Sequence, residues 1–247
     1  MINNKRVLSV ITARAGSVGV PGKNFKQLNG IPLFWWSVMA SLNSKYIDKT
    51  IISSNCDCCE KVFNDKSEFL NRKKALEWIQ RPDELSGDLS KNEDALIHVL
   101  EKLEEKYDIV VNLQPTSPCR LFSILDDCIK TYHDYGHDSL LTATEITPFL
   151  WQKKDGKWVY NIDRNDCCNR KMRQEFEDDR YNSEFIFHDN GSIYIVDVGV
   201  LLETRCRIGS NPCVFKTSGL NSFQIDTEFD FQFIEQMAVI RNLKSLI

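Results

Sequence analysis

The chain has 247 residues, of which 42% are hydrophobic and 27% charged, and its formal net charge is −4 at pH 7. This composition excludes wholesale disorder, and the slightly acidic balance argues against nucleic acid as the main partner, because neutralising phosphates needs an excess of Lys and Arg. No apolar run approaches the roughly 20 residues that a membrane helix needs, and the first residues show no signal-peptide pattern. We therefore expect one cytoplasmic domain over residues 1–247, with neither a membrane nor a nucleic acid as partner.

Strand-like and helix-like segments alternate along the first 145 residues. Strands are expected at residues 7–13, 49–53, 76–80, 108–114 and 138–145, and helices at 32–43, 92–105 and 122–132, with an interrupted helix over 57–75. Alternation of this kind indicates βαβ units with right-handed crossovers. The sequence thus predicts an α/β protein with a three-layer, Rossmann-like nucleotide-binding fold and a mostly parallel mixed sheet.

The pattern changes after residue 145. A hairpin is expected over 151–158 around Asp155-Gly156, and a strand over 192–196. Residues 163–180 are strongly charged and are expected to form a loop or a mobile lid. Thr227 and Asp230 form an Asp version of the capping box. The final helix that they open would bury one face, made of Phe233, Met237, Ile240 and Leu243.

Nine cysteines raise the alternatives of a disulfide framework and of a zinc site in the clusters at 56–59 and 167–168. The odd count and the missing secretion signal argue against the framework. We expect reduced cysteines, mostly buried as small apolar side chains.

The strongest chemical signal is the glycine-rich loop Ala13-Arg-Ala-Gly-Ser-Val-Gly-Val-Pro-Gly-Lys-Asn24, directly after the first strand. Its three glycines let backbone N–H groups face an anion, and Arg14 and Lys23 add two cations, which suits a polyphosphate. The loop is not a P-loop, because Asn24 stands where that motif has Ser or Thr. The alternative is an ordinary strand-to-helix connection with solvated lysines.

This loop resembles the signature A-R-x-G-S-K-G-x-P-x-K-N of the sugar-activating cytidylyltransferases, which act on acylneuraminate, legionaminate, pseudaminate and, more distantly, ketodeoxyoctonate. Further motifs of that family follow in the same order and extend the resemblance over nearly the whole chain. They are Asn29–Leu33, Arg81–Asp88 with Ser90 and His98, Leu113-Gln-Pro-Thr-Ser-Pro-Cys-Arg120, Asn190-Gly-Ser-Ile-Tyr-Ile195 and Ile225-Asp-Thr-Glu-Phe-Asp230.

The resemblance implies transfer of CMP from CTP to the anomeric hydroxyl of a nonulosonic, sialic-acid-like sugar acid, with release of pyrophosphate, dependence on Mg²⁺, and a homodimer formed through a small β extension at about residues 150–195. Arg14 and Lys23 would be catalytic, and Asp226 would bind the metal. Nucleotide-binding residues would be Ala13, Arg14, Gly16, Ser17, Lys23, Asn24, Arg81, Asp88 and Ser90. Acceptor-binding residues would be Gln114, Thr116, Ser117 and Asn190.

The residues themselves also permit ordinary structural roles. Asp88 would start a helix, Asn190 would be a turn residue, and Asp226 would be a capping or salt-bridge carboxylate. Gln114, Thr116 and Ser117 instead follow the carboxyl end of a strand, where open α/β sheets bind ligands. His98 and His188 are expected to be a satisfied helix histidine and a loop histidine.

The sequence departs from the family pattern at Val18, which replaces a loop lysine, at Cys119, and at Gln224, which replaces the first of two metal-binding aspartates. Residues 173–180, 190–191 and 222–226 are closer to a branch in which some members use GTP. A guanylyltransferase acting on an amino-sugar 1-phosphate is therefore one alternative. A catalytically inactive nucleotide-binding regulator is another.

Overall fold

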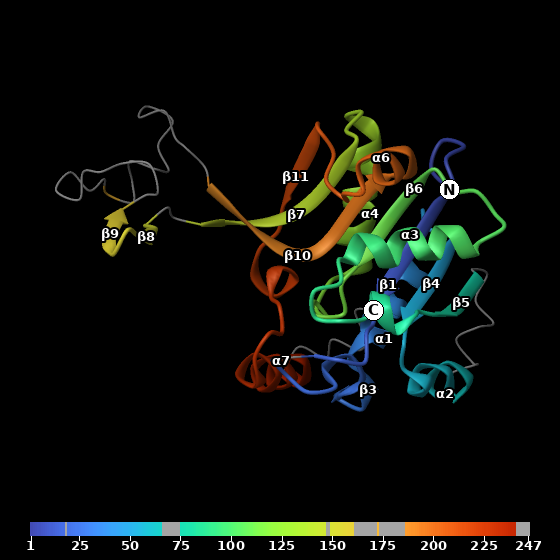
Figure 1. The fold of residues 1–247 in the computed structure, drawn as a ribbon, viewed down its shortest axis with the longest axis horizontal. Helices are drawn as coiled ribbons and strands as arrows, with labels where there is room; N and C mark the ends of the chain where they lie inside the picture. The colour runs from blue at the N-terminus through green and yellow to red at the C-terminus, as the bar shows by residue number, and fades with distance from the viewer. Residues whose placement is uncertain (18, 66–74, 147–148, 161–171, 173–185, 241–247) are drawn as a thin grey trace.

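The computed structural model describes residues 1–17, 19–65, 75–146, 149–160, 172 and 186–240, and the fold is built on a seven-stranded sheet (Figure 1). The strand order is β11-β7-β10-β6-β1-β4-β5. β10 runs antiparallel to both neighbours, and the other pairs are parallel. The strands are β1 (Val7–Thr12), β4 (Lys49–Ser54), β5 (Ala75–Gln80), β6 (Ile109–Leu113), β7 (Ser139–Ile146), β10 (Ile186–Asp197) and β11 (Pro212–Lys216).

Helices cover both faces of this sheet. Successive side chains of a strand point to opposite faces, so Val7 and Ile11 of β1 pack with α1 (Leu33–Asn43), α2 (Asp57–Asp65) and α4 (Phe122–Asp134). Leu8 and Val10 pack on the other side with α3 (Asn92–Lys102) and α6 (Val198–Thr204). The predicted three-layer α/β fold with a mostly parallel mixed sheet is confirmed.

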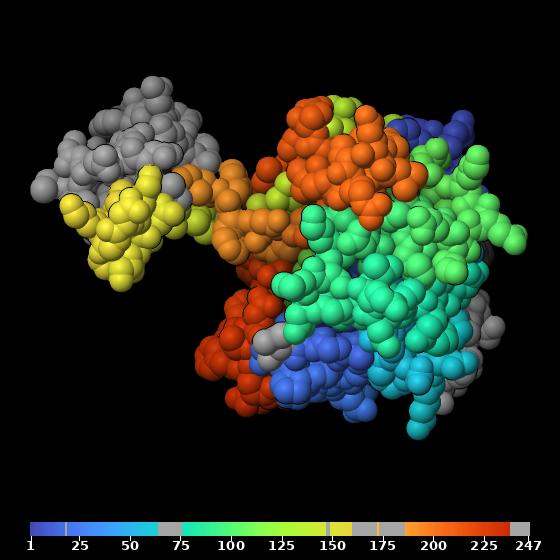
Figure 2. All heavy atoms as spheres, viewed as in Figure 1, coloured from blue at the N-terminus to red at the C-terminus, as the bar shows by residue number. Residues whose placement is uncertain are grey.

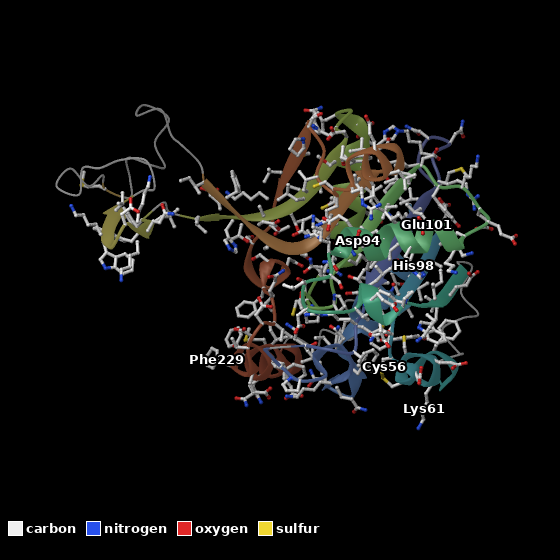
Figure 3. The ribbon with its side chains drawn as sticks, viewed as in Figure 1. Cys56, Lys61, Asp94, His98, Glu101 and Phe229 are labelled. Carbon is white, nitrogen blue, oxygen red and sulfur yellow. A yellow bond between two sulfur atoms is a disulfide. The ribbon has the colours of Figure 1, made fainter. Side chains whose placement is uncertain are left out.

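The last helix, α7 (Glu228–Ile240), packs on a small hairpin formed by β2 (Gln27–Leu28) and β3 (Ile31–Pro32). Among the side chains that the structure describes, Phe231 and Ile234 are buried, in one cluster with Leu28, so the predicted burial of Phe233 was wrong. The side chains of Ile240 and Leu243 lie outside the described part of the chain. Phe233 is 39% exposed, and Phe229 projects at the surface (Figure 3). The predicted capping box is confirmed, because Thr227 N donates to Asp230 Oδ2 and Asp230 N donates to Thr227 Oγ1.

An arm projects from the body of the molecule (Figure 2). It carries the predicted hairpin, β8 (Trp151–Lys154) and β9 (Lys157–Tyr160), whose turn residues Asp155 and Gly156 both have positive φ, as type I′ turns require. β7 and β10 lead out to it. The predicted lid over 163–180 lies outside the described residues, apart from Met172.

Several elements differ from the sequence prediction. α6, β11 and the β2–β3 hairpin were not predicted, and β10 is longer than its predicted core at 192–196. α3 begins at Asn92, so Asp88 and Ser90 lie in the preceding turn and do not start the helix. Within the described part of the chain, no helix is long and apolar enough to cross a membrane.

The cysteine prediction was partly wrong. The structure joins Cys56 and Cys58 by a disulfide. Cys59, Cys119 and Cys128 are free and buried, as expected, whereas Cys206 is exposed. Burial raises the pKa of the Cys59 thiol to about 12, partly offset by a hydrogen bond with Ser54, so this thiol is unreactive.

Candidate active site

The glycine-rich loop is fixed to its neighbours by the backbone that follows β1. Ala13 N donates to Ser53 O at 2.9 Å, and Ala15 N donates to Asn55 Oδ1 at 2.8 Å. Asn24 Nδ2 closes the loop on itself by donating to Arg14 O at 2.9 Å. The last of these bonds gives the Asn24 side chain a structural role at the end of the loop.

Gly19 brings the loop against the segment that precedes α7. A Cβ at Gly19 would lie 2.2 Å from the backbone oxygen of Asp226, a distance that real Cβ atoms do not tolerate. Only glycine therefore permits this approach. It places two segments that are distant in sequence at one edge of the sheet.

A cavity of about 270 Å³ opens there, at the carboxyl ends of the parallel strands. Open α/β sheets bind ligands in this position. The lining residues are Thr12, Arg14, Ser17, Gly19, Lys23, Asn24, Arg81, Asn92, Gln114, Pro115, Thr116 and Asp226. Within the described part of the chain, the lining thus holds three cations and one carboxylate, which favours an anionic ligand.

Two of the three cations, Arg14 and Lys23, belong to the glycine-rich loop. Arg14 Nη1 donates to Gly87 O at 2.7 Å and lies 3.0 Å from Asp88 Oδ1. Lys23 Nζ donates to Ile225 O at 2.6 Å and lies 3.3 Å from Asp226 Oδ1. Both side chains are thus held in place before any ligand arrives, which lowers the cost of binding.

Arg81, just after β5, is 3% exposed, and its Nε and Nη2 atoms have no hydrogen-bond partner among the residues that the structure describes. Burial, and secondly the nearby charge of Arg14, lower its pKa to about 10, so it remains a cation at neutral pH. Buried polar groups normally have partners. The unsatisfied guanidinium on the cavity wall therefore indicates a missing hydrogen-bond acceptor, such as a phosphate or a nucleoside oxygen.

A second cavity, of about 340 Å³, shares Asp226 with the first. It is lined by Thr144, His188, Asn190, Ser222, Phe223, Gln224, Asp226 and Asp230. Hydroxyl groups, amides and one aromatic ring are groups that bind sugars through hydrogen bonds and stacking. The two cavities thus offer a place for a phosphate-bearing ligand beside a place for a polar one, with Asp226 between them.

A three-residue irregularity in β10 shapes the second cavity. The register with β7 shifts between Asp189 and Tyr194, and Gly191 lies there at φ 61°. Asn190 fixes this turn, because Nδ2 donates to Thr144 and Thr217 while Oδ1 accepts from Thr142. Its amide is thus occupied, which favours a structural role for Asn190 on the cavity wall.

Asp226 is the carboxylate that best suits a metal ion. Its side chain is 67% exposed, whereas the carboxylate of Asp230 is engaged by Thr227 and by the backbone of Asp226. No group of three or more His, Cys, Asp or Glu that could hold a metal occurs among the described residues. One carboxylate fits Mg²⁺, which usually keeps several waters and binds through substrate phosphates.

The structure brings many of the predicted site residues together. Those on the first cavity are Arg14, Ser17, Lys23, Asn24, Arg81, Gln114, Thr116 and Asp226, and Asn190 is on the second. Ala13, Gly16, Asp88, Ser90 and Ser117 are absent from both linings. Asp88 pairs with Arg14, Ser90 Oγ donates to Glu84 O, and Ser117 is buried. Asp226 lies in the loop before α7, and its ion pair with Lys23 shows that the salt-bridge role also holds.

Sequence reasoning missed other residues on the two linings. Thr12 ends β1 and Asn92 starts α3. Thr12 directly precedes the glycine-rich loop and Asn92 follows the Arg81 turn, and these positions in the sequence could have identified both as lining residues.

His188 was expected to be a loop histidine, but it lies in β10 on the second cavity. His98 lies on α3, as expected, but its buried Nδ1 has no partner within the described residues. Burial lowers the pKa of His98, with nearby Lys102 as the next cause. Val18 lies outside the described residues.

Together, the sheet and the loop have the three-layer α/β architecture of the nucleotidyltransferases. A solved structure of CMP:2-keto-3-deoxy-manno-octonic acid synthetase complexed with CTP shares this fold, with a TM-score of 0.68 at 15% identity, over 96% of this chain and 99% of that one. A family model described as cytidylyltransferase matches residues 8–152. The chain belongs to the cytidylyltransferase family.

Two curated relatives extend the similarity along the chain. N-acylneuraminate cytidylyltransferase of Oncorhynchus mykiss is 29% identical over 234 residues, which cover 94% of this chain and 50% of that protein. CMP-N,N'-diacetyllegionaminic acid synthase of Legionella pneumophila is 28% identical over 238 residues, covering 94% of this chain and 96% of that protein. The chain therefore spans about half the length of the fish relative and nearly the whole of the bacterial one.

Proposed function

We propose that this protein transfers CMP from CTP to the anomeric hydroxyl of a nonulosonic, sialic-acid-like sugar acid and releases pyrophosphate. The observation that carries the proposal is the convergence of Arg14, Lys23 and Arg81 on one cavity at the carboxyl edge of the sheet. Two nitrogens of Arg81, Nε and Nη2, lack a hydrogen-bond partner among the described residues. The names of the curated relatives support the choice of donor and acceptor class.

The chemistry would proceed by displacement at the α-phosphorus of CTP. A bond forms from the anomeric oxygen to phosphorus, the bond to the β-phosphate oxygen breaks, and pyrophosphate leaves with the electron pair. The hydroxyl proton passes to water. Because negative charge grows on the leaving group, Arg14 and Lys23 would act by electrostatic stabilisation and positioning.

Each side of the site would have its own substrate. The first cavity would hold the nucleotide, with Arg81 supplying the hydrogen-bond donors that lack a partner. The second cavity would hold the acceptor sugar, with Gln114 at its border, and Gln224, Ser222 and His188 on its wall. Asp226, common to both cavities, would bind Mg²⁺, which when bound supplies positive charge to the phosphates.

We also propose a homodimer that uses the projecting arm. Trp158, in β9, is 64% exposed, and the register places it opposite Lys153 of β8. A second copy would remove this large aromatic surface from water. We expect the wild type to sediment as a dimer and Trp158→Glu to sediment as a monomer.

The cytoplasmic location expected from the sequence stays a prediction.

A grid of donors and acceptors tests the activity. Pyrophosphate release is measured with CTP or GTP, Mg²⁺, and a panel of nonulosonic acids and amino-sugar 1-phosphates, and nucleotide binding is measured by calorimetry. We expect turnover with CTP and a nonulosonic acid. Turnover with GTP alone would instead support the guanylyltransferase alternative. Nucleotide binding without turnover against every acceptor would support the regulator.

A further inference from the structure

Arg120 is a buried arginine whose guanidinium, within the described part of the chain, donates only to neutral oxygens. It is 1% exposed and lies just before α4. Nε donates to Ser192 Oγ at 3.1 Å, and Nη1 donates to Ser37 Oγ at 3.1 Å. Nη2 donates to Gln114 O at 2.9 Å and to Ser192 O at 2.5 Å. These four bonds join α1, the end of β6 and β10.

The charge of this side chain is not balanced by a nearby acid. No carboxylate lies within ion-pair distance of the guanidinium in the part of the chain that the structure describes. Burial lowers the pKa of Arg120 to about 9, and the group still carries its charge at neutral pH. An unpaired buried charge is costly, and an apolar side chain of similar size would pack at lower cost. Packing alone therefore does not explain why an arginine occupies this position.

The bonds of Arg120 end at residues that border the two cavities. Gln114 lines the first cavity, and Ser37 Oγ also donates to its carbonyl oxygen at 3.2 Å. Ser192 directly follows Gly191, the positive-φ residue of the β10 turn. Arg120 itself is absent from both cavity linings, so it touches neither ligand site directly.

At Gly191 the two cavity borders come together. A Cβ on Gly191 would lie 1.9 Å from Gln224 Nε2 and 3.1 Å from Gln114 Oε1. The side chains of Gln114 and Gln224 thus meet over this glycine, one from each cavity. A change in the spacing between the end of β6 and the β10 turn would therefore move both amides.

We propose that Arg120 is a positioning residue, whose guanidinium sets the spacing between Gln114, at the border of the two cavities, and Gly191 on the acceptor side. The inference rests on the proposed function, because it assigns the second cavity to the acceptor. The planar fork of arginine reaches Ser192 and Gln114 at once, and a lysine ammonium cannot reproduce this geometry.

The test compares Arg120→Lys and Arg120→Met with the wild type in steady-state kinetics, CTP calorimetry and thermal unfolding. We expect the acceptor KM to rise, or kcat to fall, on the order of tenfold to a hundredfold in both variants, because small misplacements of reacting groups carry such costs. The Kd for CTP is expected to stay within about twofold, since Arg14, Lys23 and Arg81 are untouched.

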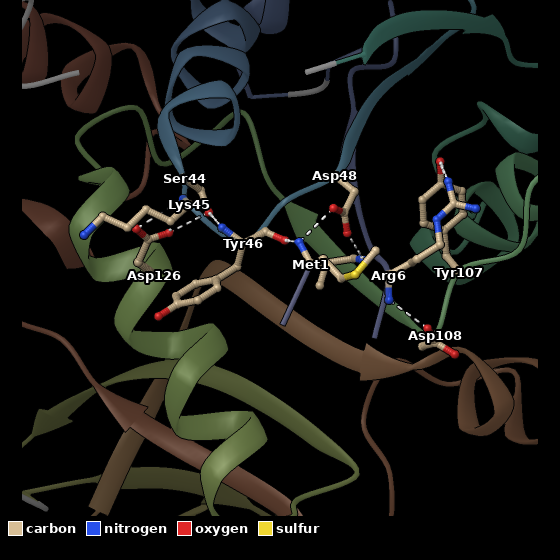
Figure 4. Close-up of polar contacts among 10 residues, drawn as sticks. Met1, Arg6, Ser44, Lys45, Tyr46, Asp48, Tyr107, Asp108 and Asp126 are labelled. Carbon is tan, nitrogen blue, oxygen red and sulfur yellow. Dashed lines mark hydrogen bonds and ion pairs between the residues drawn. The ribbon is translucent and has the colours of Figure 1, made fainter. Parts of the chain in front are cut away.

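Asp126→Asn is the matched control. Asp126 lies on α4, is buried, and accepts hydrogen bonds from Ser44 Oγ at 2.6 Å and Lys45 N at 3.0 Å, away from both cavities (Figure 4). This variant is expected to unfold at a lower temperature with unchanged acceptor kinetics. Ser37→Ala, which removes one hydroxyl partner, is expected to shift the acceptor KM in the same direction by a smaller factor, and it serves where the Arg120 variants do not fold.

Two results separate the possible failures. If the wild type turns over but the Arg120 and Ser37 variants change only the unfolding temperature, as Asp126→Asn does, Arg120 is merely structural and the inference is overturned alone. If the wild type neither binds CTP nor turns over any acceptor, the proposed function falls and the inference falls with it.

Discussion

Lys23 and Asp226, 203 residues apart in the sequence, form an ion pair of 3.3 Å between Nζ and Oδ1. The lysine side chain is 12% exposed, whereas the aspartate side chain is 67% exposed. The ammonium is thus held in place by the protein, and the carboxylate is free to turn toward solvent. Under the proposed function, the phosphates of CTP would replace the carboxylate at Lys23, and Asp226 would then be available to Mg²⁺.

Lys23→Ala is expected to reduce kcat/KM for pyrophosphate release on the order of a hundredfold to a thousandfold, because it removes a fixed charge beside the leaving group. The fold should remain intact, since a partly exposed ion pair contributes little to stability. Lys26→Ala is the control, because Lys26 pairs with Glu228 at the surface. A near-normal rate for Lys23→Ala would show that the site has been mislocated.

Asp226→Ala is expected to abolish Mg²⁺-dependent transfer and to leave the circular dichroism spectrum unchanged. Asp226 is the one carboxylate that lines the first cavity in the described structure. The measurement is the rate of pyrophosphate release across a Mg²⁺ titration. Glu228→Ala, which removes an exposed carboxylate two residues away, should behave as the wild type. Transfer by Asp226→Ala with an unaltered Mg²⁺ dependence would exclude Asp226 as the metal ligand.

The sequence allowed the sheet and the loop to be predicted because both depend on local patterns. The β-branched run at Val7–Thr12 marks a strand buried on both faces, and glycines with flanking cations mark a loop that faces an anion. The carboxyl end of β6 placed Gln114 and Thr116 at the correct edge of the sheet. Each of these features is determined by residues that are adjacent in the sequence.

The features that escaped prediction depend on contacts between distant segments. Nothing near Arg120 in the sequence shows that its guanidinium reaches Ser37 and Ser192. The buried face of α7 is selected by the β2–β3 hairpin against which Phe231 packs, which is why Phe233 was wrongly placed inside. Asp88 carries a helix-start signal, but α3 begins only at Asn92, and Asp88 pairs with Arg14 from the preceding turn.

Gly19→Ala is expected to destabilise the protein and lower its activity, because a Cβ would lie 2.2 Å from the backbone oxygen of Asp226. The steric cost of overpacking is typically about 1–3 kcal/mol. Gly16→Ala is the control for stability, since a Cβ there meets nothing within 4 Å. Urea denaturation of both variants provides the measurement. Equal stability of the two variants would contradict the close contact between the loop and Asp226.

Acidification is expected to weaken the start of α7 through Asp230. Burial alone would raise the pKa of this carboxyl, but hydrogen bonds from Thr227 and the backbone of Asp226 outweigh it, and the pKa is lowered. The folded state therefore binds its proton less readily than the unfolded state, whose pKa is about 3.9. The contribution of the ionised Asp230 to the free energy of unfolding is therefore present above about pH 3.9 and is lost as the pH falls below that value.

Urea denaturation between pH 3 and pH 7 checks this. Asp230→Asn should be less stable than the wild type at pH 7, and the difference should shrink below about pH 4. A difference that stays constant across this range would show that the charge of Asp230 does not stabilise the helix.

Arg81→Met is expected to separate ligand binding from stability. The buried Nε and Nη2 atoms have no partner in the described structure, and each unsatisfied buried group costs about 1–3 kcal/mol. The variant should therefore unfold at a temperature equal to or above that of the wild type without nucleotide, while its Kd for CTP rises on the order of tenfold or more.

Arg205→Met, which removes an exposed arginine paired with Asp94, should keep the wild-type Kd. Thermal unfolding and calorimetry provide both readouts. A less stable Arg81→Met protein with unchanged CTP affinity would mean that the guanidinium supports the fold and that the nucleotide binds elsewhere.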